Sequence, residues 1–421
     1  MPSRLPEWLE RISALHPSEI ELGLDRMHVV ADRLLGKEWL AGKVVTLAGT
    51  NGKGSTLAMI ERLAIDAGKS VMAYTSPHLL RFTERLRING AESQESEWAE
   101  AFKQVEGARQ GTPLTYFEFT TLAALWLIRQ ARPDLALLEV GLGGRLDAVN
   151  IVDPDVAVIT PVDLDHTDWL GEDREAIGRE KAGILRPGIP LISSDPVVPE
   201  SVLQAARELE CPVWLWDRDH RIESVSGAAR WLGSTVSQGG VDLQRTLPGF
   251  DQCPLPPENV SAALQVAQLL GLLPQQDQVS PWEALGLSGR VQRIGESPEI
   301  IVDVGHNPQA ARYLAGWLNR NSCTGRTWAV YSALADKAIE EVVQTLSGSI
   351  QDWWIAPVKA DRAAPADRLA GAVRQAGHVP VVMASIREAL AQVRQQAAPN
   401  DRVLVFGSFY TVAEALEALQ G

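Results

Sequence analysis

The stretch KVVTLAGTNGKGST, residues 43–56, decides the fold class. Residues 44–48 form an apolar run typical of a buried parallel strand, a glycine-rich turn follows, and apolar residues repeat at helical spacing over 55–67. Backbone N–H groups at such a strand-to-helix turn can hold a phosphate chain, and Lys53 adds a positive charge. We therefore expect a phosphate-binding loop rather than a glycine-rich turn without a ligand.

This loop is a variant of the strict pattern G-x-x-x-x-G-K-[ST]. Leu47 occupies the position of the first glycine, and Gly54 stands where serine or threonine would follow the lysine. Ser55 comes one residue later.

Strand-like runs alternate with helical patterns on both sides of this loop, which predicts an α/β protein. We expect an N-terminal P-loop-type ATPase domain with a mostly parallel sheet over residues 1–288, and a C-terminal Rossmann-like domain over residues 289–421. The predicted strands are residues 43–48, 70–74, 135–140, 156–160 and 190–193, then 300–304, 327–331, 353–357, 380–383 and 403–407. Residues 196–289 have a less regular pattern with one clear helix, 259–270.

Composition excludes several classes of protein. The chain of 421 residues carries 39 Lys plus Arg against 53 Asp plus Glu, a net charge of −14, which argues against a nucleic-acid partner. Its three cysteines form no C-x-x-C pair, so neither a disulfide framework nor a thiolate zinc site is expected. The longest apolar stretch, residues 122–128, is far shorter than the ~20 residues that span a bilayer. We expect a soluble cytoplasmic protein without a membrane partner.

Polar side chains follow two further predicted strands. Glu139 ends one apolar strand before a glycine run, and the segment Asp163–Asp168, which includes His166, follows the next strand. Open α/β sheets bind ligands at such strand ends, and Mg²⁺ accepts a few protein ligands together with phosphates and water. Each residue alone is more often structural or solvated. Together, beside a phosphate loop, Glu139 and His166 favour a metal site.

Two other segments are ambiguous by composition. Residues 178–183, GREKAG, have the composition of an exposed charged helical turn. In residues 303–308, DVGHNP, Asn307 suits a helix N-cap and Pro308 the first helical position, which leaves Asp303 and His306 as polar groups facing a potential crevice.

Taken together, these segments resemble folylpolyglutamate synthase/dihydrofolate synthase of the Mur ligase superfamily. The matching motifs occur in order over nearly the whole chain: AGTNGKGS (48–55), TSPHL (75–79), ERLRING (84–90), EVGLGGRLDA (139–148), DHTDWLG (165–171), GREKAGI (178–184), DVGHNP (303–308) and VFGSFYTV (405–412). The segment TYFEF (115–119) further resembles the bacterial bifunctional enzymes, which make dihydrofolate and extend its glutamate tail.

The resemblance implies roles for residues at matching positions. ATP would be bound by Gly49, Thr50, Asn51, Gly52, Lys53, Gly54, Ser55, Asn259, Arg290 and Asp303. One or two Mg²⁺ ions would be bound by Ser76, Glu139 and His166. The pterin site would be lined by Glu21, Leu22, Gly23, Leu24, Thr115, Tyr116, Phe117, Leu146, Asp147 and Ala148. The incoming glutamate would lie near His306, Ser408 and Tyr410.

The resemblance also implies a reaction. A substrate carboxylate would take the γ-phosphoryl group of ATP, and the amine of L-glutamate would displace phosphate from the acyl phosphate. Lys53 and His306 would neutralise phosphoryl charge, and Lys181 would be a carbamylated lysine that helps to position metal. The substrates would be dihydropteroate, reduced folates and L-glutamate, a monovalent cation such as K⁺ could take part, and the enzyme would be a monomer. The alternatives are another Mur-type amino acid ligase, or a P-loop nucleotide switch without ligase activity.

Overall fold

The computed structural model describes residues 2–16, 21–36, 40–225, 228–250, 253–273 and 287–420. The chain divides into two compact units, Met1–Leu285 and Gly286–Gly421. Each unit is described by itself. The boundary that we predict from the sequence, after residue 288, lies close to this division and stays a prediction.

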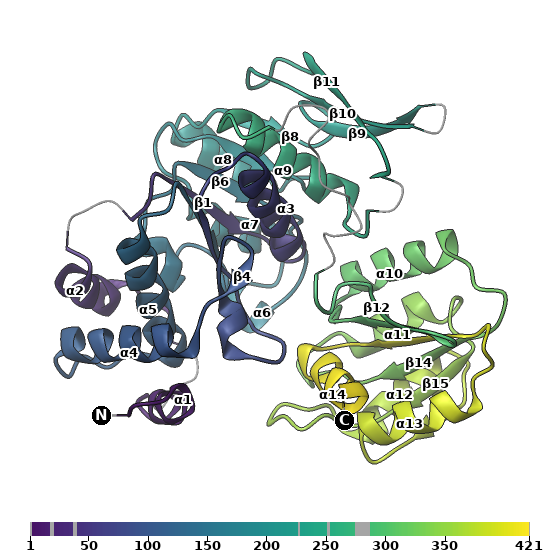
Figure 1. Cartoon of the computed structure of the whole chain (residues 1–421). Helices are drawn as coiled ribbons and strands as arrows, with labels where there is room; N and C mark the ends of the chain where they lie inside the picture. Colours follow the sequence, from purple (N-terminus) through teal and green to yellow (C-terminus); the bar gives the residue numbers. More distant parts are fainter. Residues whose placement is uncertain are drawn as a thin grey trace. The chain divides into compact units, whose positions relative to one another are not determined.

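The first unit is built on an eight-stranded sheet with the order β4-β3-β2-β5-β1-β6-β7-β8 (Figure 1). Its strands are β1 (Lys43–Ala48), β2 (Val71–Tyr74), β3 (Leu86–Ile88), β4 (Ala91–Glu92), β5 (Leu135–Glu139), β6 (Val156–Ile159), β7 (Leu191–Ser193) and β8 (Val213–Leu215). In this order, the six strands β2, β5, β1, β6, β7 and β8 pair in parallel. The pairs β2 with β3 and β3 with β4 are antiparallel. The predicted mostly parallel sheet is confirmed.

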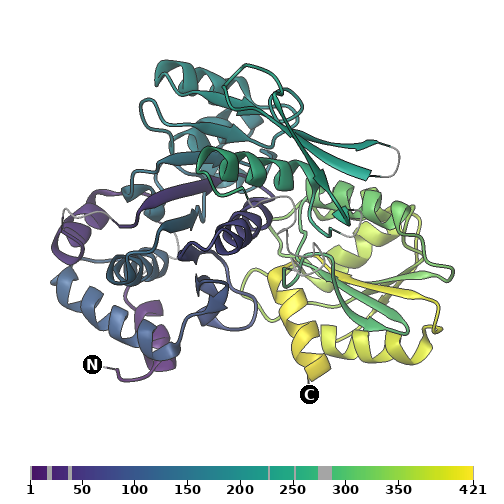
Figure 2. The same ribbon diagram turned by 45° about the horizontal axis from the view of Figure 1, so that its top comes forward.

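Helices cover both faces of this sheet. They are α1 (Leu5–Ser13), α2 (Asp25–Leu34), α3 (Lys53–Asp66), α4 (Glu95–Arg109), α5 (Tyr116–Ala131), α6 (Thr167–Leu170), α7 (Arg174–Ala182), α8 (Glu200–Glu208) and α9 (Pro257–Leu269), with 3₁₀ turns η1 (Phe82–Arg85) and η2 (Ala148–Ile151). Helices α4 and α5 pack side by side on one face, and α3 lies along α9 on the other (Figures 1 and 2).

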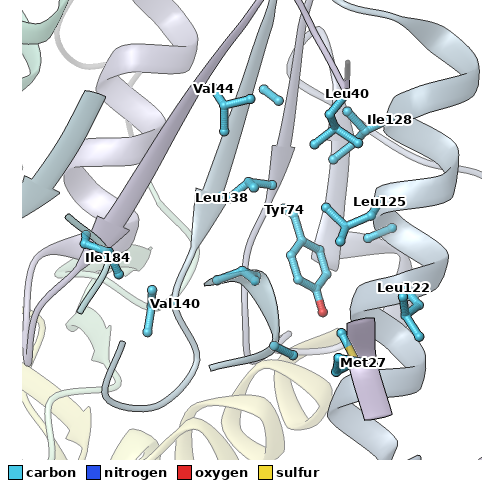
Figure 3. Close-up of a cluster of buried hydrophobic side chains, with 14 of the residues drawn as sticks. Met27, Leu40, Val44, Tyr74, Leu122, Leu125, Ile128, Leu138, Val140 and Ile184 are labelled. Atoms are coloured by element: carbon cyan, nitrogen blue, oxygen red, sulfur yellow. The ribbon is translucent and has the colours of Figure 1, made fainter. Parts of the chain in front are cut away.

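Strand periodicity explains this layering. Alternate side chains of a strand point to opposite faces, so Val44, Tyr74 and Leu138 face the same side. There they pack with Leu122 and Leu125 of α5 in one buried cluster (Figure 3). The intervening strand residues are also buried, which is why the strands read as continuous apolar runs rather than as alternating patterns.

The region with the less regular sequence contains a small antiparallel sheet. Strands β9 (Arg221–Val225), β10 (Ala228–Gly233) and β11 (Leu243–Leu247) pair in the order β11-β10-β9 and lie against helix α9 (Figures 1 and 2). The sequence pattern did not predict these strands, because only a few of their side chains are buried and apolar alternation is weak.

The second unit is a six-stranded sheet with the order β12-β13-β17-β14-β15-β16. Its strands are β12 (Gln292–Glu296), β13 (Glu299–Asp303), β14 (Thr327–Tyr331), β15 (Asp352–Ile355), β16 (Pro380–Val382) and β17 (Arg402–Phe406). Its helices are α10 (Pro308–Arg320), α11 (Ile339–Leu346), α12 (Ala366–Gln375), α13 (Ile386–Gln396) and α14 (Phe409–Gln420). All pairs except β12 with β13 are parallel, which confirms the predicted Rossmann-like class. In the described part of the chain, no helix is long and apolar enough to cross a membrane.

Candidate active site

The loop between β1 and α3 has the geometry of a phosphate-binding turn. The first helical hydrogen bond of α3 runs from Thr56 N–H to the Gly52 carbonyl at 2.9 Å, so the N–H groups of residues 53–55 precede the helical ladder. The ammonium of Lys53 folds back over the loop and donates to the Gly49 carbonyl at 2.9 Å. An anion at the start of α3 would be bound by donors of this kind.

Hydrogen bonds fasten this loop to the segment after β6. The Thr50 hydroxyl donates to the Asp163 carbonyl at 2.9 Å and accepts from the Asp163 N–H at 3.0 Å. The Thr50 N–H donates to the Pro161 carbonyl at 2.9 Å. The predicted phosphate loop and the predicted metal segment Asp163–Asp168 are therefore neighbours.

Strand register brings Glu139 to the same edge of the sheet. Leu47 of β1 is paired with Glu139 of β5, and Ala48 is paired with Ile159 of β6. The Glu139 side chain is 7% exposed and accepts a hydrogen bond from the Ser76 N–H at 3.2 Å. The structure thus brings two of the predicted metal-site residues, Ser76 and Glu139, into contact.

His166, the third predicted metal residue, lies in the segment after β6, at the start of α6. It is the N-cap of α6 with φ of 52°, and its Nε2 lies 3.9 Å from the Asp165 carboxylate. Among the described residues, no group of three or more His, Cys, Asp or Glu side chains is arranged as a metal site. A metal bound by Glu139 and His166 would therefore need Ser76, water and phosphate oxygens to complete its coordination.

Lys181 is buried, so the exposed position that the composition of GREKAG predicts is wrong for this residue. It is 3% exposed in the last turn of α7, whereas its neighbour Arg179 is exposed. Burial and the nearby Lys53 ammonium lower the pKa of Lys181 to about 7, against the opposing effect of Asp165 and Asp147. At neutral pH a large fraction of this amine is therefore uncharged and nucleophilic.

The glycine run after β5 explains how Lys181 is held. A Cβ on Gly144 would lie 2.9 Å from the Lys181 carbonyl oxygen, so only glycine lets this loop approach α7. The Arg145 N–H donates to the Glu180 carbonyl at 2.8 Å. The EVGLGGRLDA and GREKAGI segments, far apart in sequence, are therefore packed together.

Asp147, predicted in the pterin site, has a buried carboxylate that organises this same loop. It accepts from the N–H groups of Gly141 at 3.0 Å, Leu142 at 2.8 Å and Val149 at 3.0 Å. Burial raises its pKa to about 6, while those N–H donors and Lys53 act in the opposite direction. Its neighbours Leu146 and Ala148 flank it at the start of η2.

The predicted substrate residues of α5 lie against this loop. Thr115 caps α5 in a capping box with Glu118, in which the Thr115 N–H donates to Glu118 at 2.8 Å. A Cβ on Gly141 would lie 2.6 Å from the Phe117 ring, and Phe117 stacks on Tyr74 with centroids 6.5 Å apart. Tyr116 meets the Phe82 ring edge-on.

Arg26 joins the N-terminal substrate segment to this helix. Its guanidinium donates to the Glu118 carboxylate at 2.9 Å, to the Glu21 carbonyl at 2.6 Å, and to the Glu21 carboxylate. The predicted segment 21–24 is therefore tied to the cap of α5. Arg26 was not predicted from the sequence, although the capping-box pattern of Thr115 and Glu118 could have drawn attention to Glu118, its partner.

In the second unit, Asp303 and its neighbours gather at the ends of two adjacent strands. Asp303 of β13 is paired with Phe406 of β17, so the loops DVGHNP and GSFY leave the sheet together. The buried Asp303 carboxylate accepts from the Val291 N–H at 2.8 Å and the Gly305 N–H at 2.6 Å. Burial raises its pKa, against the opposing effect of Arg290.

The remaining predicted residues of the second unit surround this point. The Arg290 guanidinium lies over the Phe409 ring, 5.2 Å from its centroid. His306 Nδ1 lies 2.9 Å from the Val304 carbonyl, and Asn307 caps α10 by accepting from the Ala310 N–H at 2.9 Å, as predicted. The Ser408 hydroxyl is buried against Thr411 at 2.7 Å, whereas Tyr410 is 49% exposed.

Comparisons with known proteins identify the family. The Mur ligase middle domain matches residues 47–228, and the Mur ligase glutamate ligase domain matches residues 289–409. The dihydrofolate synthase/folylpolyglutamate synthase of Escherichia coli (strain K12) is 41% identical over 99% of this chain and 96% of its own length. This chain belongs to the dihydrofolate synthase/folylpolyglutamate synthase family of Mur ligases.

Solved structures of the family agree in fold. E. coli FolC in complex with DHPP and ADP has a TM-score of 0.90 at 39% identity, covering 100% of this chain and 99% of that one. A bifunctional folylpolyglutamate synthase/dihydrofolate synthase with Mn, AMPPNP and L-glutamate bound has a TM-score of 0.88 at 40% identity, covering 100% and 98%. The family and enzyme class predicted from the sequence are confirmed: the chain is a Mur-type ATP-dependent ligase, and ligation of glutamate to folates is the activity of its family.

Proposed function

We propose that this dihydrofolate synthase/folylpolyglutamate synthase family member adds L-glutamate both to dihydropteroate and to the γ-carboxyl group of reduced folates. One observation carries the proposal: strand register places Glu139 beside the loop that leads to Lys53, and the Lys53 ammonium is near enough to the buried Lys181 to help lower its pKa. A phosphate-loop cation, a strand-end carboxylate and a lysine with a lowered pKa are the groups that an acyl-phosphate ligase needs in one place.

The residues fit ATP and Mg²⁺ on chemical grounds. When bound, ATP supplies the phosphoryl group that activates a carboxylate as an acyl phosphate, and Mg²⁺ neutralises phosphate charge. The segment Gly49–Ser55 offers N–H groups, and its glycines allow a phosphate to approach the backbone. Lys53 would turn from the Gly49 carbonyl to a phosphate oxygen. In the structures of relatives, this chemistry is represented by ADP, and by AMPPNP with Mn.

Ser76, Glu139 and His166 are assigned to the metal. Glu139 is the anionic member, and its carboxylate accepts a hydrogen bond from the Ser76 N–H at 3.2 Å. Asp165 next to His166 would orient the imidazole. A monovalent cation such as K⁺ is also part of the proposal, with no residues assigned to it.

Lys181 is assigned as a carbamylated residue. A cationic lysine beside Lys53 would repel metal, whereas an amine with a pKa of about 7 can add CO₂ and become an anion. The carbamate would hold a metal ion or its water from α7. Asp147 and Asp165 lie near enough to influence the charge of Lys181 and would help to hold the unmodified form.

The substrate acid is assigned to the segments 21–24, 115–117 and 146–148. The aromatic rings of Tyr116 and Phe117 offer flat apolar surfaces of the kind that bind a pterin or benzoyl ring. Arg26 would fix the N-terminal segment on α5 while the substrate enters.

In the second unit, Arg290 and Asp303 are assigned to the nucleotide, together with Asn259 of the first unit. His306, Ser408 and Tyr410 are assigned to glutamate and to charge neutralisation. The exposed phenol of Tyr410 and the imidazole of His306 both follow the ends of paired strands β13 and β17.

The test is a product analysis. The protein is incubated with ATP, Mg²⁺ and L-glutamate, and with either dihydropteroate or a reduced folate, and the products are analysed by mass. We expect a gain of one glutamyl residue on each acid, with phosphate release that requires both the acid and glutamate. Phosphate release without them would favour a nucleotide switch, and product only with a cell-wall precursor would favour another Mur-type ligase. The predicted monomer, the cytoplasmic location and the absence of nucleic-acid and membrane partners stay predictions.

A further inference from the structure

Arg85 is a buried cation in the first unit that the proposed mechanism does not use. It is 7% exposed at the end of η1, immediately before strand β3. Its guanidinium carbon lies 5.4 Å from the centroid of the Phe82 ring and 5.7 Å from that of the Tyr116 ring. Arginine stays protonated in proteins, so a full positive charge lies between these rings.

The one hydrogen-bonding partner of Arg85 among the described residues is neutral. Arg85 Nε donates to His78 Nδ1 at 2.8 Å. Because Nδ1 accepts this bond, His78 carries its proton on Nε2 and is uncharged. His78 orients the guanidinium without balancing its charge.

The carboxylates nearby are each committed to another group. Arg81 pairs with Glu92 at 2.5 Å, and Arg87 pairs with Glu61 at 2.6 Å. Glu84 accepts from the N–H groups of Leu79 at 2.7 Å, Leu80 at 2.9 Å and Arg81 at 2.7 Å. Of the three arginines along this segment, Arg85 is the most buried, and within the described residues it has no carboxylate partner.

A buried charge without a counter-ion lowers the stability of the fold, and an anionic ligand that pairs with it removes this loss.

The surroundings connect Arg85 to the substrate site. Its carbonyl accepts a hydrogen bond from the Thr75 N–H at 2.8 Å, one residue before Ser76, and its guanidinium covers Tyr116. An anion bound by Arg85 would therefore lie between the metal segment and the pterin segment.

This anion differs from the carboxylate that reacts. Lys53 lies in the phosphate loop, where its ammonium donates to the Gly49 carbonyl, whereas Arg85 lies over the Tyr116 ring of the pterin segment. The reacting carboxylate must lie near Lys53 and the metal residues. Dihydropteroate carries only that carboxylate, whereas a folate also carries an α-carboxylate on its terminal glutamate.

We propose that Arg85 binds the α-carboxylate of the terminal glutamate of a folate substrate, and so distinguishes folates from dihydropteroate. This inference rests on the proposed function, since it assigns a second anionic contact in the same substrate site. The guanidinium would make a paired, charge-assisted contact with that carboxylate.

The experiment compares wild type, Arg85→Met and Arg85→Lys by equilibrium binding without ATP, and then by steady-state kinetics. The ligands are a reduced folate monoglutamate, the same folate with its α-carboxylate replaced by a carboxamide, and dihydropteroate. Arg81→Met is the matched control, because it removes a neighbouring arginine that is exposed and paired with Glu92. Thermal unfolding of each variant is recorded without ligand.

We expect Arg85→Met to weaken binding and raise KM for the folate by about tenfold or more, as for loss of a hydrogen bond between charged groups. Binding of dihydropteroate and of the carboxamide should change by less than about threefold. Arg85→Lys should recover part of the folate affinity, and Arg81→Met should leave it unchanged. The unfolding temperature of Arg85→Met should not fall, because the variant removes an uncompensated buried charge.

Equal weakening of all three ligands would overturn the proposal, and so would an unchanged folate affinity with a lower unfolding temperature. The binding measurement needs no turnover. A wild-type protein that binds the folate more tightly than its carboxamide, but forms no glutamyl product, would therefore refute the proposed ligase function and leave the role of Arg85 standing.

Discussion

Gly52 and Asn259 lie in direct contact: a Cβ on Gly52 would lie 2.6 Å from Asn259 Nδ2. Gly52 ends the phosphate loop with φ of 87°, and Asn259 is buried in the first turn of α9, where its Oδ1 accepts from the Ser194 hydroxyl at 3.1 Å. The phosphate loop is thus positioned by a helix that lies two hundred residues later in the chain. This contact explains physically why two residues far apart in sequence belong to one proposed nucleotide site.

Gly52→Ala should therefore lower the free energy of unfolding by about 1–3 kcal/mol, because alanine is strained at this φ and its Cβ meets Asn259. Chemical denaturation measures the change. Gly54→Ala is the control, since no atom lies within 4 Å of a Cβ at that helical position. The combination Gly52→Ala with Asn259→Gly should recover the steric part of the loss. Full stability of Gly52→Ala alone would contradict the contact.

Lys53→Ala should abolish ligation without unfolding the protein. The Lys53 ammonium donates to the carbonyls of Gly49 and Thr50 and to no carboxylate among the described residues, so its loss breaks no ion pair there. Removing one group that stabilises transition-state charge typically costs about 10²–10³ in kcat. Product formation and the unfolding temperature are measured beside Lys69→Ala, which removes an exposed lysine just beyond the other end of α3. Wild-type turnover in Lys53→Ala would remove this loop from the mechanism.

Glu139→Gln should raise the Mg²⁺ concentration needed for half-maximal activity by about tenfold or more, because the site would lose its anionic ligand. The amide keeps the shape of the side chain and can still accept from the Ser76 N–H. Activity is titrated with Mg²⁺ for this variant and for Glu172→Gln, an exposed acid that we expect to be neutral. Identical titrations of wild type and Glu139→Gln would show that Glu139 is only a strand-end residue.

Fold class could be predicted from the sequence because buried parallel strands leave continuous apolar runs. The predicted runs at 43–48, 135–140 and 403–407 coincide with β1, β5 and β17 to within one residue. The small sheet β9–β11 could not be predicted, because few of its strand residues are buried and the strands have no strong pattern. Burial of Lys181 could not be read from composition either, since the surrounding GREKAG is polar and the covering comes from the glycine loop around Gly144.

Most of the candidate site residues could be predicted from the motifs in the sequence, whereas their pairing in space could not. The sequence predicts that Glu139 ends a strand beside the phosphate loop, but no spacing rule predicts that this strand pairs with β1, which places Glu139 opposite Leu47. Arg26 and Arg85 were missed for the same reason. Arginine is common on protein surfaces, so the residue type alone gives no signal. Arg26 is important because it pairs with Glu118, and Arg85 because it is buried against His78 with no carboxylate partner among the described residues.

Phe117→Leu should separate the two synthase activities. The ring stacks on Tyr74 and closes over Gly141, so leucine leaves apolar packing but removes the flat surface. We expect kcat/KM for dihydropteroate to fall by about tenfold, with a smaller loss for reduced folates, because a ligand without a glutamate tail depends more on ring contacts. Phe102→Leu, a buried change whose ring packs on Phe82 and Phe119 rather than on Tyr74, controls for lost packing. Equal losses on both acids would count against a dedicated pterin contact.

Lys181 yields the sharpest prediction, because its charge and its modification both depend on pH. Its pKa is lowered from 10.5 to about 7 in the folded protein. Between these values the unfolded chain binds more protons than the folded one, so in CO₂-free buffer the contribution of Lys181 to stability rises with pH by up to ~1.4 kcal/mol per unit. Below pH 7 both states are protonated and the full cost of the buried charge remains.

The difference in unfolding free energy between Lys181→Met and wild type should therefore be largest below pH 7 and shrink toward pH 10. Titrating groups that do not interact with Lys181 contribute equally to both proteins and cancel in this difference. When CO₂ is restored, the mass of the wild type in a gently prepared sample should rise by one CO₂ on this side chain, and the mass of Lys181→Met should not change. Lys181→Ala should lose most activity, and short carboxylic acids should partly restore it, whereas Lys181→Arg should stay inactive because its cation cannot be carbamylated. A pH-independent difference together with an active alanine variant would show that Lys181 is an ordinary cation with no part in the metal site.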